Sequence, residues 1–173
     1  MKKGQVVTGI IEKTTFPNKG ILNTEDQHQV IVKNTLPGQK VSASINKIRK
    51  GKAEGRLLEV LKKAENEQKE PYCPHFGACG GCSYQTLSYE DQIALKEIQI
   101  RDLLADVISK TCDFDKVFLG IKRSPRQFGY RNKMEFSFGD SYKDGPLSLG
   151  MHKRGSFYDI VTVDACKIVD EDY

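Results

Sequence analysis

The stretch GQVVTGIIEK, residues 4–13, decides the fold of the first third of the chain, because it is rich in β-branched residues and has an alternating pattern. Alternation of this kind is typical of a strand with one buried face. Short segments of similar character follow, separated by turn sequences such as FPNKG and LPGQK. Five short strands predict an OB-like barrel, although the last segment also fits a helix from residue 57 on. The four further segments are GILNTED at 20–26, HQVIVKN at 28–34, KVSASINKIRK at 40–50 and EGRLLEVLKK at 54–63.

The rest of the chain has a different character. Residues 64–72, AENEQKEPY, are polar, charged and interrupted by Pro71, which indicates a linker and a domain boundary. Residues 87–109 then have helical spacing, and the segments 132–140, 146–153 and 156–164 have strand character with the turns KDG and KRG between them. A helix followed by a small antiparallel sheet is therefore expected. The apolar face of the helix is predicted to contain Tyr89, Ile93, Ile100, Leu104 and Val107.

The charge of the chain is uneven. Residues 1–63 carry 13 lysines and arginines against 5 aspartates and glutamates, a balance of +8, whereas residues 64–173 carry 14 against 18, a balance of −4. A basic segment of this kind is typical of a module that contacts polyanions. A solvated lysine-rich surface gives the same numbers, so charge alone leaves both interpretations open.

The length and composition exclude several classes of protein. A chain of 173 residues is long enough for one ordinary domain or two small ones. No run approaches the roughly 18 apolar residues of a membrane span, and the start, MKKGQVVTGIIEK, lacks the apolar core of a secretory signal. Five cysteines, three of them close together, argue against a secreted disulfide scaffold. We therefore expect a protein of the reducing cytoplasm.

Three cysteines stand in CPHFGACGGC, residues 73–82, with the spacing C-x5-C-x2-C. Structural zinc sites usually have two short-spaced pairs, whereas iron–sulfur sites often combine three clustered thiolates with a distant fourth. The glycines of the segment let backbone approach a bulky inorganic core. From spacing alone the fourth thiolate is either Cys112 or Cys166. A zinc site completed by His75, and inert or redox-active thiols, remain alternatives.

The residues of this segment and its surroundings resemble a known family. CPHFGACGGCSYQTLSYEDQIALKEIQIRDLL, residues 73–104, resembles the cluster segment of the bacterial RNA uracil-5-methyltransferases, which use S-adenosylmethionine to methylate C5 of uridine in 23S ribosomal RNA. VVTGIIEKTTFPNKGI, at 6–21, and LPGQKV, at 36–41, are similar to the TRAM domain that opens many of these enzymes. GYRNKMEFSFG, at 129–139, and LGMHKRGSFYDIVTVDAC, at 149–166, resemble strands of their central domain.

The resemblance implies a mainly β fold with α elements. The domain organisation that it implies is an OB-like TRAM barrel over residues 1–63, a linker over 64–72 and an α+β iron–sulfur central domain over 73–173. In this family four cysteines bind a [4Fe–4S] cluster, and by that pattern the ligands are Cys73, Cys79, Cys82 and Cys166. Cys112 falls outside the motif and is expected to be an ordinary buried thiol. The cluster is expected to be structural, because methyl transfer needs no electron.

The catalytic half of the family is missing from this sequence, so no catalytic residue is assigned. That half binds S-adenosylmethionine and carries a nucleophilic cysteine in an Asp-Pro-Pro-Arg context, and no such segment is present. In the reaction that the resemblance implies, a thiolate adds to C6 of uracil and C5 then attacks the methyl group. We expect this chain to be the N-terminal portion of such an enzyme, acting as a monomer with no membrane partner.

The part of the enzyme present here is expected to hold ribosomal RNA. Basic side chains of the barrel would contact phosphates, and basic residues interleaved with aromatics suit unstacked bases. For each residue a purely structural alternative remains, namely a solvated charge or an aromatic ring packed in its own turn. The candidates are Lys13, Phe16, Lys19, Lys47, Arg49, Lys50, Lys52 and Arg56 in the barrel, and Arg123, Arg126, Phe128, Tyr130, Arg131 and Lys133 in the second part.

Two other classes of function compete with this interpretation. A free-standing TRAM protein would bind RNA through the same barrel without belonging to an enzyme. An iron–sulfur electron carrier would use the cysteines but would leave the basic barrel unexplained. A radical S-adenosylmethionine enzyme is set aside, because its C-x3-C-x2-C signature is absent.

Overall fold

The computed structural model describes residues 1–172. The chain divides into two compact units, each of which is discontinuous in sequence. The first comprises Met1–Glu67 and Glu90–Lys122, and the second comprises Gln68–Tyr89 and the chain from Arg123 on. The helical segment thus belongs with the barrel, while the cysteine loop joins the C-terminal strands. The predicted boundary at residues 64–72 stays a prediction.

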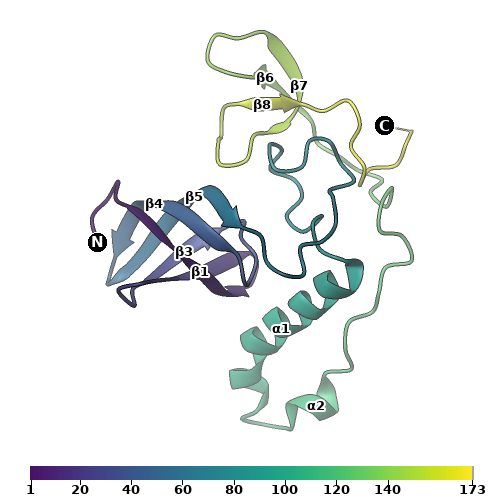
Figure 1. Ribbon diagram of the computed structural model, residues 1–173. Coiled ribbons are helices and arrows are strands. Elements are labelled where there is room, and N and C mark those ends of the chain that lie inside the picture. Colours follow the sequence, from purple (N-terminus) through teal and green to yellow (C-terminus); the bar gives the residue numbers. More distant parts are fainter. Residues whose placement is uncertain (173) are drawn as a thin grey trace. The chain divides into compact units, whose positions relative to one another are not determined.

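Five strands close into a barrel in the first unit (Figure 1). Their order around the barrel is β1-β2-β3-β5-β4, with β3 and β5 parallel and the other neighbours antiparallel. A closed barrel leaves no free sheet edge in this part of the chain. The strands are β1 (Val6–Thr15), β2 (Lys19–Thr24), β3 (Gln29–Lys33), β4 (Lys40–Arg49) and β5 (Lys52–Lys62).

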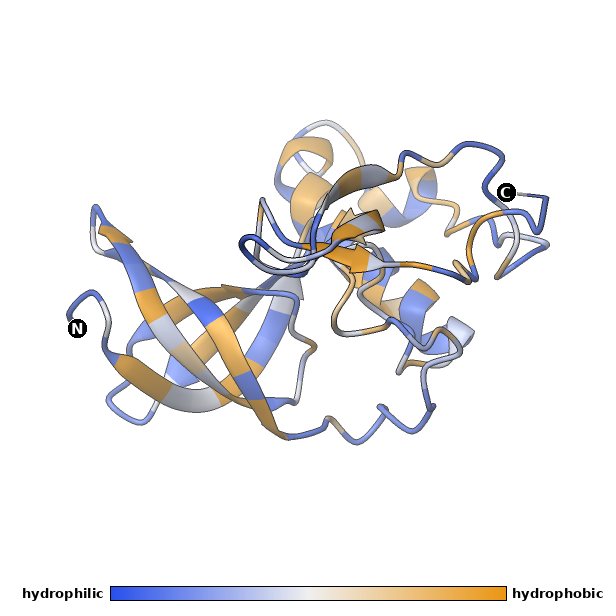
Figure 2. Cartoon of the chain, turned by 90° about the horizontal axis from the view of Figure 1, so that it is seen from above, coloured by the Kyte–Doolittle hydropathy of each residue, from blue (hydrophilic) through white to orange (hydrophobic). Residues whose placement is uncertain are grey.

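The barrel forms because alternate side chains along each strand point into it. In β3 the burial alternates so that Val30 and Val32 have no exposed surface, and Ile11, Leu22 and Val41 fill the same core from the other strands. Figure 2 shows the resulting alternation of hydrophobic and hydrophilic residues along the barrel strands. The prediction of an OB-like barrel is confirmed, and the segment that also fitted a helix from residue 57 on is strand β5.

A tight hairpin joins β4 to β5. Arg49 pairs with Lys52, and the two residues between them, Lys50 and Gly51, have positive φ angles of 48° and 76°. Two-residue turns with this backbone match the right-handed twist of the strands, and glycine adopts it without steric cost. The hairpin therefore carries several of the predicted phosphate-binding residues to one end of the two strands.

The helix α1 (Tyr89–Ile108) is confirmed, but its predicted buried face is wrong in its last turns. The buried positions are Leu95 and Gln99, neither of which belongs to the predicted face, whereas Leu104 is 38% and Val107 67% exposed. Helical periodicity identifies an apolar stripe but not how much of it a neighbour covers. A short helix, α2 (Phe114–Val117), follows, and the Arg101 guanidinium lies over the rings of Phe114 and Phe118 at 5.3 and 4.8 Å from their centroids.

The second unit contains the small antiparallel sheet that the sequence predicts. Its strands are β6 (Ser137–Asp140), β7 (Leu147–His152) and β8 (Ile160–Thr162), in the order β6-β7-β8. They are shorter than the predicted segments. In particular, residues 132–136 precede β6 without joining it. β7 lies at the centre, so its backbone has partners on both sides. Its end at His152 is hydrogen-bonded to the cysteine loop.

Candidate functional site

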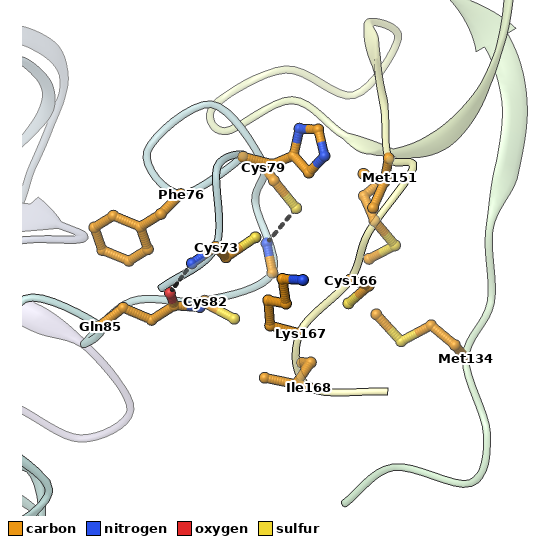
Figure 3. A pocket seen from close by; sticks show the side chains of 13 residues that line it. Cys73, Phe76, Cys79, Cys82, Gln85, Met134, Met151, Cys166, Lys167 and Ile168 are labelled. Carbon is orange, nitrogen blue, oxygen red and sulfur yellow. Dashed lines mark hydrogen bonds between the residues drawn. The ribbon is translucent and has the colours of Figure 1, made fainter. Parts of the chain in front are cut away.

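Four of the five cysteines lie around a single cavity in the second unit. Cys73, Cys79 and Cys82 reach it from the loop before α1, and Cys166 reaches it from the segment after β8. Figure 3 shows their sulfur atoms turned toward the same space. Apolar side chains complete the wall, among them Met134, Met151 and Ile168.

Main-chain hydrogen bonds fix the cysteine loop to the end of β7. The N–H of Gly80 donates to the carbonyl oxygen of His152 over 2.9 Å, and the N–H of Arg154 donates to that of Ala78 over 2.7 Å. Cys79 thereby forms an antiparallel bridge with Lys153. A Cβ atom at Gly80 would lie 3.0 Å from the His152 carbonyl oxygen, so glycine permits this close approach.

A second set of main-chain bonds fixes the segment that carries Cys166. The N–H groups of Gly129 and Tyr130 donate to the carbonyl oxygens of Lys167 and Ile168, over 3.0 and 3.1 Å. The N–H of Asp170 donates back to Arg131 over 2.9 Å. Backbone pairing of this kind orders Cys166 independently of any ligand.

The cysteine loop also contains local contacts that orient its side chains. The N–H of Gly81 lies 3.3 Å from the Cys79 sulfur, and the N–H of Cys73 donates to the Gln85 side chain over 3.0 Å. His75 Nε2 lies 2.7 Å from an oxygen of Asp164, which joins the loop to the Cys166 segment a second time. His75 lines the cavity as well, so the structure does not separate it from the thiols.

Burial and charge act together on the thiol of Cys82. Burial raises its pKa, a hydrogen bond with Gln85 lowers it, and the thiols of Cys166, Cys73 and Cys79 raise it further. The other three thiols of the cavity therefore disfavour ionisation of Cys82.

The cationic side chain of Arg154 contacts the cysteine loop. Its guanidinium donates to the carbonyl oxygen of Cys82 and lies 5.4 Å from the centroid of the Phe76 ring. Burial lowers the pKa of Arg154, and the nearby Cys79 and Cys82 act in the opposite direction.

The donor set fits an iron–sulfur cluster in its chemistry. Four thiols and backbone N–H groups directed at sulfur are what such clusters require. The free space between the side chains is about 20 Å³, close to the room that one water molecule needs, so a cluster would require the thiols to rotate outward. Among residues 1–172, no three His, Cys, Asp or Glu side chains are arranged to hold a single metal ion. The identity of the ligands and of the metal group stays a prediction.

Cys112 is not among the residues that line the cavity, and the expectation that it is buried is wrong. It is exposed in the turn after α1, and its thiol donates to the carbonyl oxygen of Ile108 over 3.7 Å. It belongs to the first unit, whereas the four cysteines of the cavity belong to the second. It stands in a polar turn whose residues, 109–113, are all exposed.

The predicted RNA-contacting residues of the barrel are exposed, with two already in ion pairs. Lys13 Nζ lies 3.4 Å from Asp102 on α1, and Lys47 Nζ lies 3.9 Å from Glu54 across the β4–β5 pair. The Phe16 ring is 53% exposed, so it is not packed beneath its own turn. Whether these residues contact RNA stays a prediction. The exposed ones that form no ion pair within residues 1–172 are Lys19, Arg49, Lys50, Lys52 and Arg56.

The predicted residues of the second unit lie on a stretch without regular structure, residues 121–136. Arg126 and Phe128 line a cleft of about 560 Å³, whereas Tyr130 is 52% exposed outside it. Lys133 pairs with Glu135 over 3.0 Å, and Arg131 lies 3.6 Å from the Met134 sulfur. Arg123 and Arg126 are exposed.

Sequence reasoning missed two residues that line the same cleft, Tyr72 and Lys167. Each is next in the chain to a cysteine of the cavity, Tyr72 before Cys73 and Lys167 after Cys166. An aromatic and a basic residue beside the two ends of the cysteine set are the signal that could have identified them.

The chain is similar to a known domain family and to several known proteins. Residues 1–58 match the TRAM domain model. Over all 173 residues the chain is 44% identical to an uncharacterized RNA methyltransferase of Caldanaerobacter subterraneus subsp. tengcongensis. It is 45% identical over the same length to one of Clostridium tetani, and 42% identical to one of Clostridium acetobutylicum. The chain spans 37% of the length of each of these relatives.

No helix within residues 1–172 combines the length and the apolar character needed to cross a bilayer.

Proposed function

We propose that this chain, which carries a TRAM domain and is similar along its whole length to proteins named RNA methyltransferases, is the RNA-holding and iron–sulfur portion of an S-adenosylmethionine-dependent 23S rRNA (uracil-C5)-methyltransferase. The barrel would contact the RNA backbone, and the second unit would hold a [4Fe–4S] cluster and further RNA. The protein would act in the cytoplasm as a monomer.

The observation that carries the proposal is the assembly of Cys73, Cys79, Cys82 and Cys166 around one cavity. Cys82 and Cys166 are 84 positions apart in the sequence, and a set of four thiols is the one that the resemblance to uracil-5-methyltransferases implies. The names of the relatives support RNA methylation in general. The specific base, the specific RNA and the cofactors come from the resemblance.

The residues present support a holding role for this portion of the enzyme. Bound between the loop and the Cys166 segment, a cluster would supply covalent cross-links that contribute directly to folding energy. The barrel offers exposed cations on a rigid scaffold, which suits phosphate contacts that position an RNA without reading its sequence. A target uridine would have to leave its stack to react, so an extended holding surface is needed beside the reacting centre.

The proposal is tested by metal analysis and by RNA binding of the same preparation. Protein purified without oxygen should contain about four iron and four sulfide per chain, as a cubane held by four thiolates requires. It should also bind RNA with an affinity that falls as salt concentration rises. One zinc with no sulfide would contradict the cluster, and an absence of salt-dependent RNA binding would contradict the RNA-holding role.

A further inference from the structure

The cleft beside the cysteine cavity has the composition of a nucleotide-binding site. It has a volume of about 560 Å³ and is lined by three aromatic residues, Tyr72, Phe128 and Phe136, and by two cationic ones, Arg126 and Lys167. Apolar residues such as Val163 and Val169 form part of its wall. Pockets of this size with a few convergent polar groups are typical of ligand sites.

The rings of Tyr72 and Phe128 form a platform that remains open to solvent. Their centroids are 4.7 Å apart and their planes are tilted by 47°, so neither ring face is fully covered by the other. Tyr72 is 62% and Phe128 39% exposed. Exposed aromatic rings in a cleft are the groups on which bases of single-stranded nucleic acids stack, because every base has a π face.

Positive charge is placed beside this platform. The Lys167 Nζ lies 5.5 Å from the centroid of the Tyr72 ring, and Arg126 lines the same cleft. A phosphate next to a stacked base would therefore meet two cations.

The lining also contains three carboxylates, against the two cations Arg126 and Lys167. Of these carboxylates, Asp164 is paired with His75 over 2.7 Å. Asp170 accepts from the N–H of Asp172 over 3.4 Å. Glu171 is the third carboxylate in the lining, and it is exposed.

The platform is built on ordered backbone. Phe128 precedes Gly129, whose N–H donates to the carbonyl oxygen of Lys167, so the ring and the cation are held by one main-chain ladder. Tyr72 is fixed at the start of the cysteine loop, where the N–H of Cys73 donates to Gln85. An arrangement that is ordered before binding loses less entropy when the ligand binds.

We infer that the cleft lined by Tyr72, Arg126, Phe128 and Lys167 binds one unpaired nucleotide of an RNA strand. Its base stacks on the aromatic pair and its phosphate lies against the two cations. The inference rests on the RNA-holding role proposed above and assigns it a specific subsite. A protein partner would also find exposed rings here, but a ring pair with a cation 5.5 Å from the centroid of one ring matches a base with its attached phosphate.

The test measures binding of the full 173-residue chain to two probes, a short single-stranded RNA carrying one 2-aminopurine and a fully paired RNA duplex. Tyr72→Ala and Phe128→Ala should each weaken binding to the single strand about tenfold, in the range expected for one lost stacking contact. Binding to the duplex should change little, because its bases are not available. The quenching of 2-aminopurine on binding should also be lost.

Two further variants distinguish stacking from charge and from misfolding. Tyr72→Phe keeps the ring and should retain both affinity and quenching. Lys167→Gln should weaken binding and reduce the slope of log affinity against log salt by about 0.7, the contribution of one phosphate contact on a single strand. Tyr142→Ala is the matched control, because Tyr142 is 64% exposed and lies outside the cleft, and it should bind like the original chain.

The outcomes separate this inference from the proposed function. If the original chain binds RNA in a salt-dependent way while Tyr72→Ala and Phe128→Ala bind the single strand equally well, the inference is wrong and the RNA-holding role stands. If Tyr72→Phe loses as much affinity as Tyr72→Ala, the ring does not act by stacking, which also overturns the inference. If the original chain binds neither RNA, the proposed function itself fails.

Discussion

The N–H of Arg154 donates to the carbonyl oxygen of Ala78 over 2.7 Å, across 76 positions of the sequence. This bond holds Ala78, in the middle of the cysteine loop, against the turn that follows β7. With the neighbouring bond from Gly80 to His152, it makes the loop an additional strand-like partner of the small sheet. Main-chain hydrogen bonds thus hold the cysteine loop in place without the need for a group bound by its thiols.

The first prediction concerns the fourth thiol. Cys166→Ser should lose or destabilise the iron–sulfur cluster, because Cys166 lines the cavity with the other three cysteines. Cys112→Ser is the matched control and should retain the cluster, because Cys112 is exposed in the other unit. Iron and sulfide content and the visible absorbance of anaerobically purified protein measure both. Loss of the cluster in Cys112→Ser alone would show that Cys112, and not Cys166, is the fourth ligand.

The second prediction concerns Arg154. Replacing it with alanine removes the donor to the Cys82 carbonyl and the cation over Phe76, and should lower the free energy of unfolding by about 1–3 kcal/mol. Arg154→Lys should recover only part of this, because an ammonium lacks the planar group that stacks and donates at once. Denaturant titrations followed by circular dichroism give the values.

Lys153 supplies the control for Arg154. It is the adjacent residue and has an exposed side chain, so Lys153→Ala should leave stability nearly unchanged. Equal losses in the two variants would mean that the hairpin turn as a whole, rather than the half-buried guanidinium, determines the effect.

The third prediction concerns the cations near the β4–β5 hairpin. Neutralising Lys47, Arg49, Lys50 and Lys52 together should weaken binding to all RNAs alike and flatten the salt dependence. If roughly four contacts are made to a single strand, the slope of log affinity against log salt is near −3 before the change. Titrations over a salt series, with a hairpin RNA and a duplex, measure it. An unchanged slope would identify the hairpin as a solvated turn.

The fourth prediction concerns the barrel core. Leu22 has no exposed surface, so Leu22→Ala should destabilise the barrel by about 2–5 kcal/mol through lost burial and a residual cavity. Leu58 is the same residue type on β5 but is 46% exposed, and Leu58→Ala should cost much less. Thermal unfolding of the two variants side by side tests the assigned faces. Similar losses would indicate that β5 is buried on both faces.

The fifth prediction concerns activity and rests on the proposed function. The 173-residue chain should not transfer a methyl group from S-adenosylmethionine to RNA, because it contains no Asp-Pro-Pro-Arg segment. Incorporation of labelled methyl groups into a uridine-containing RNA is the measurement. Any transfer above background would show that the chain carries a catalytic centre of its own.

The sequence by itself determined the parts of this protein that depend on neighbouring residues. The strands of the barrel follow from alternation, as in β3, and the turn at Lys50 and Gly51 follows from local backbone preference. The grouping of Cys73, Cys79 and Cys82 is equally local, since all three stand within ten positions. Each of these features is encoded within a few residues, so a pattern can reveal it.

Only the tertiary structure decided the relationships between distant segments. It brings Cys166 to the other three thiols and leaves Cys112 outside, although spacing alone allowed either. It also brings Tyr72 beside Phe128 and Lys167, and buries Gln99 on α1 while leaving Val107 exposed. The physical reason is that sheet pairing and side-chain packing depend on which surfaces meet across many intervening residues, and periodicity within one segment carries no information about its partner.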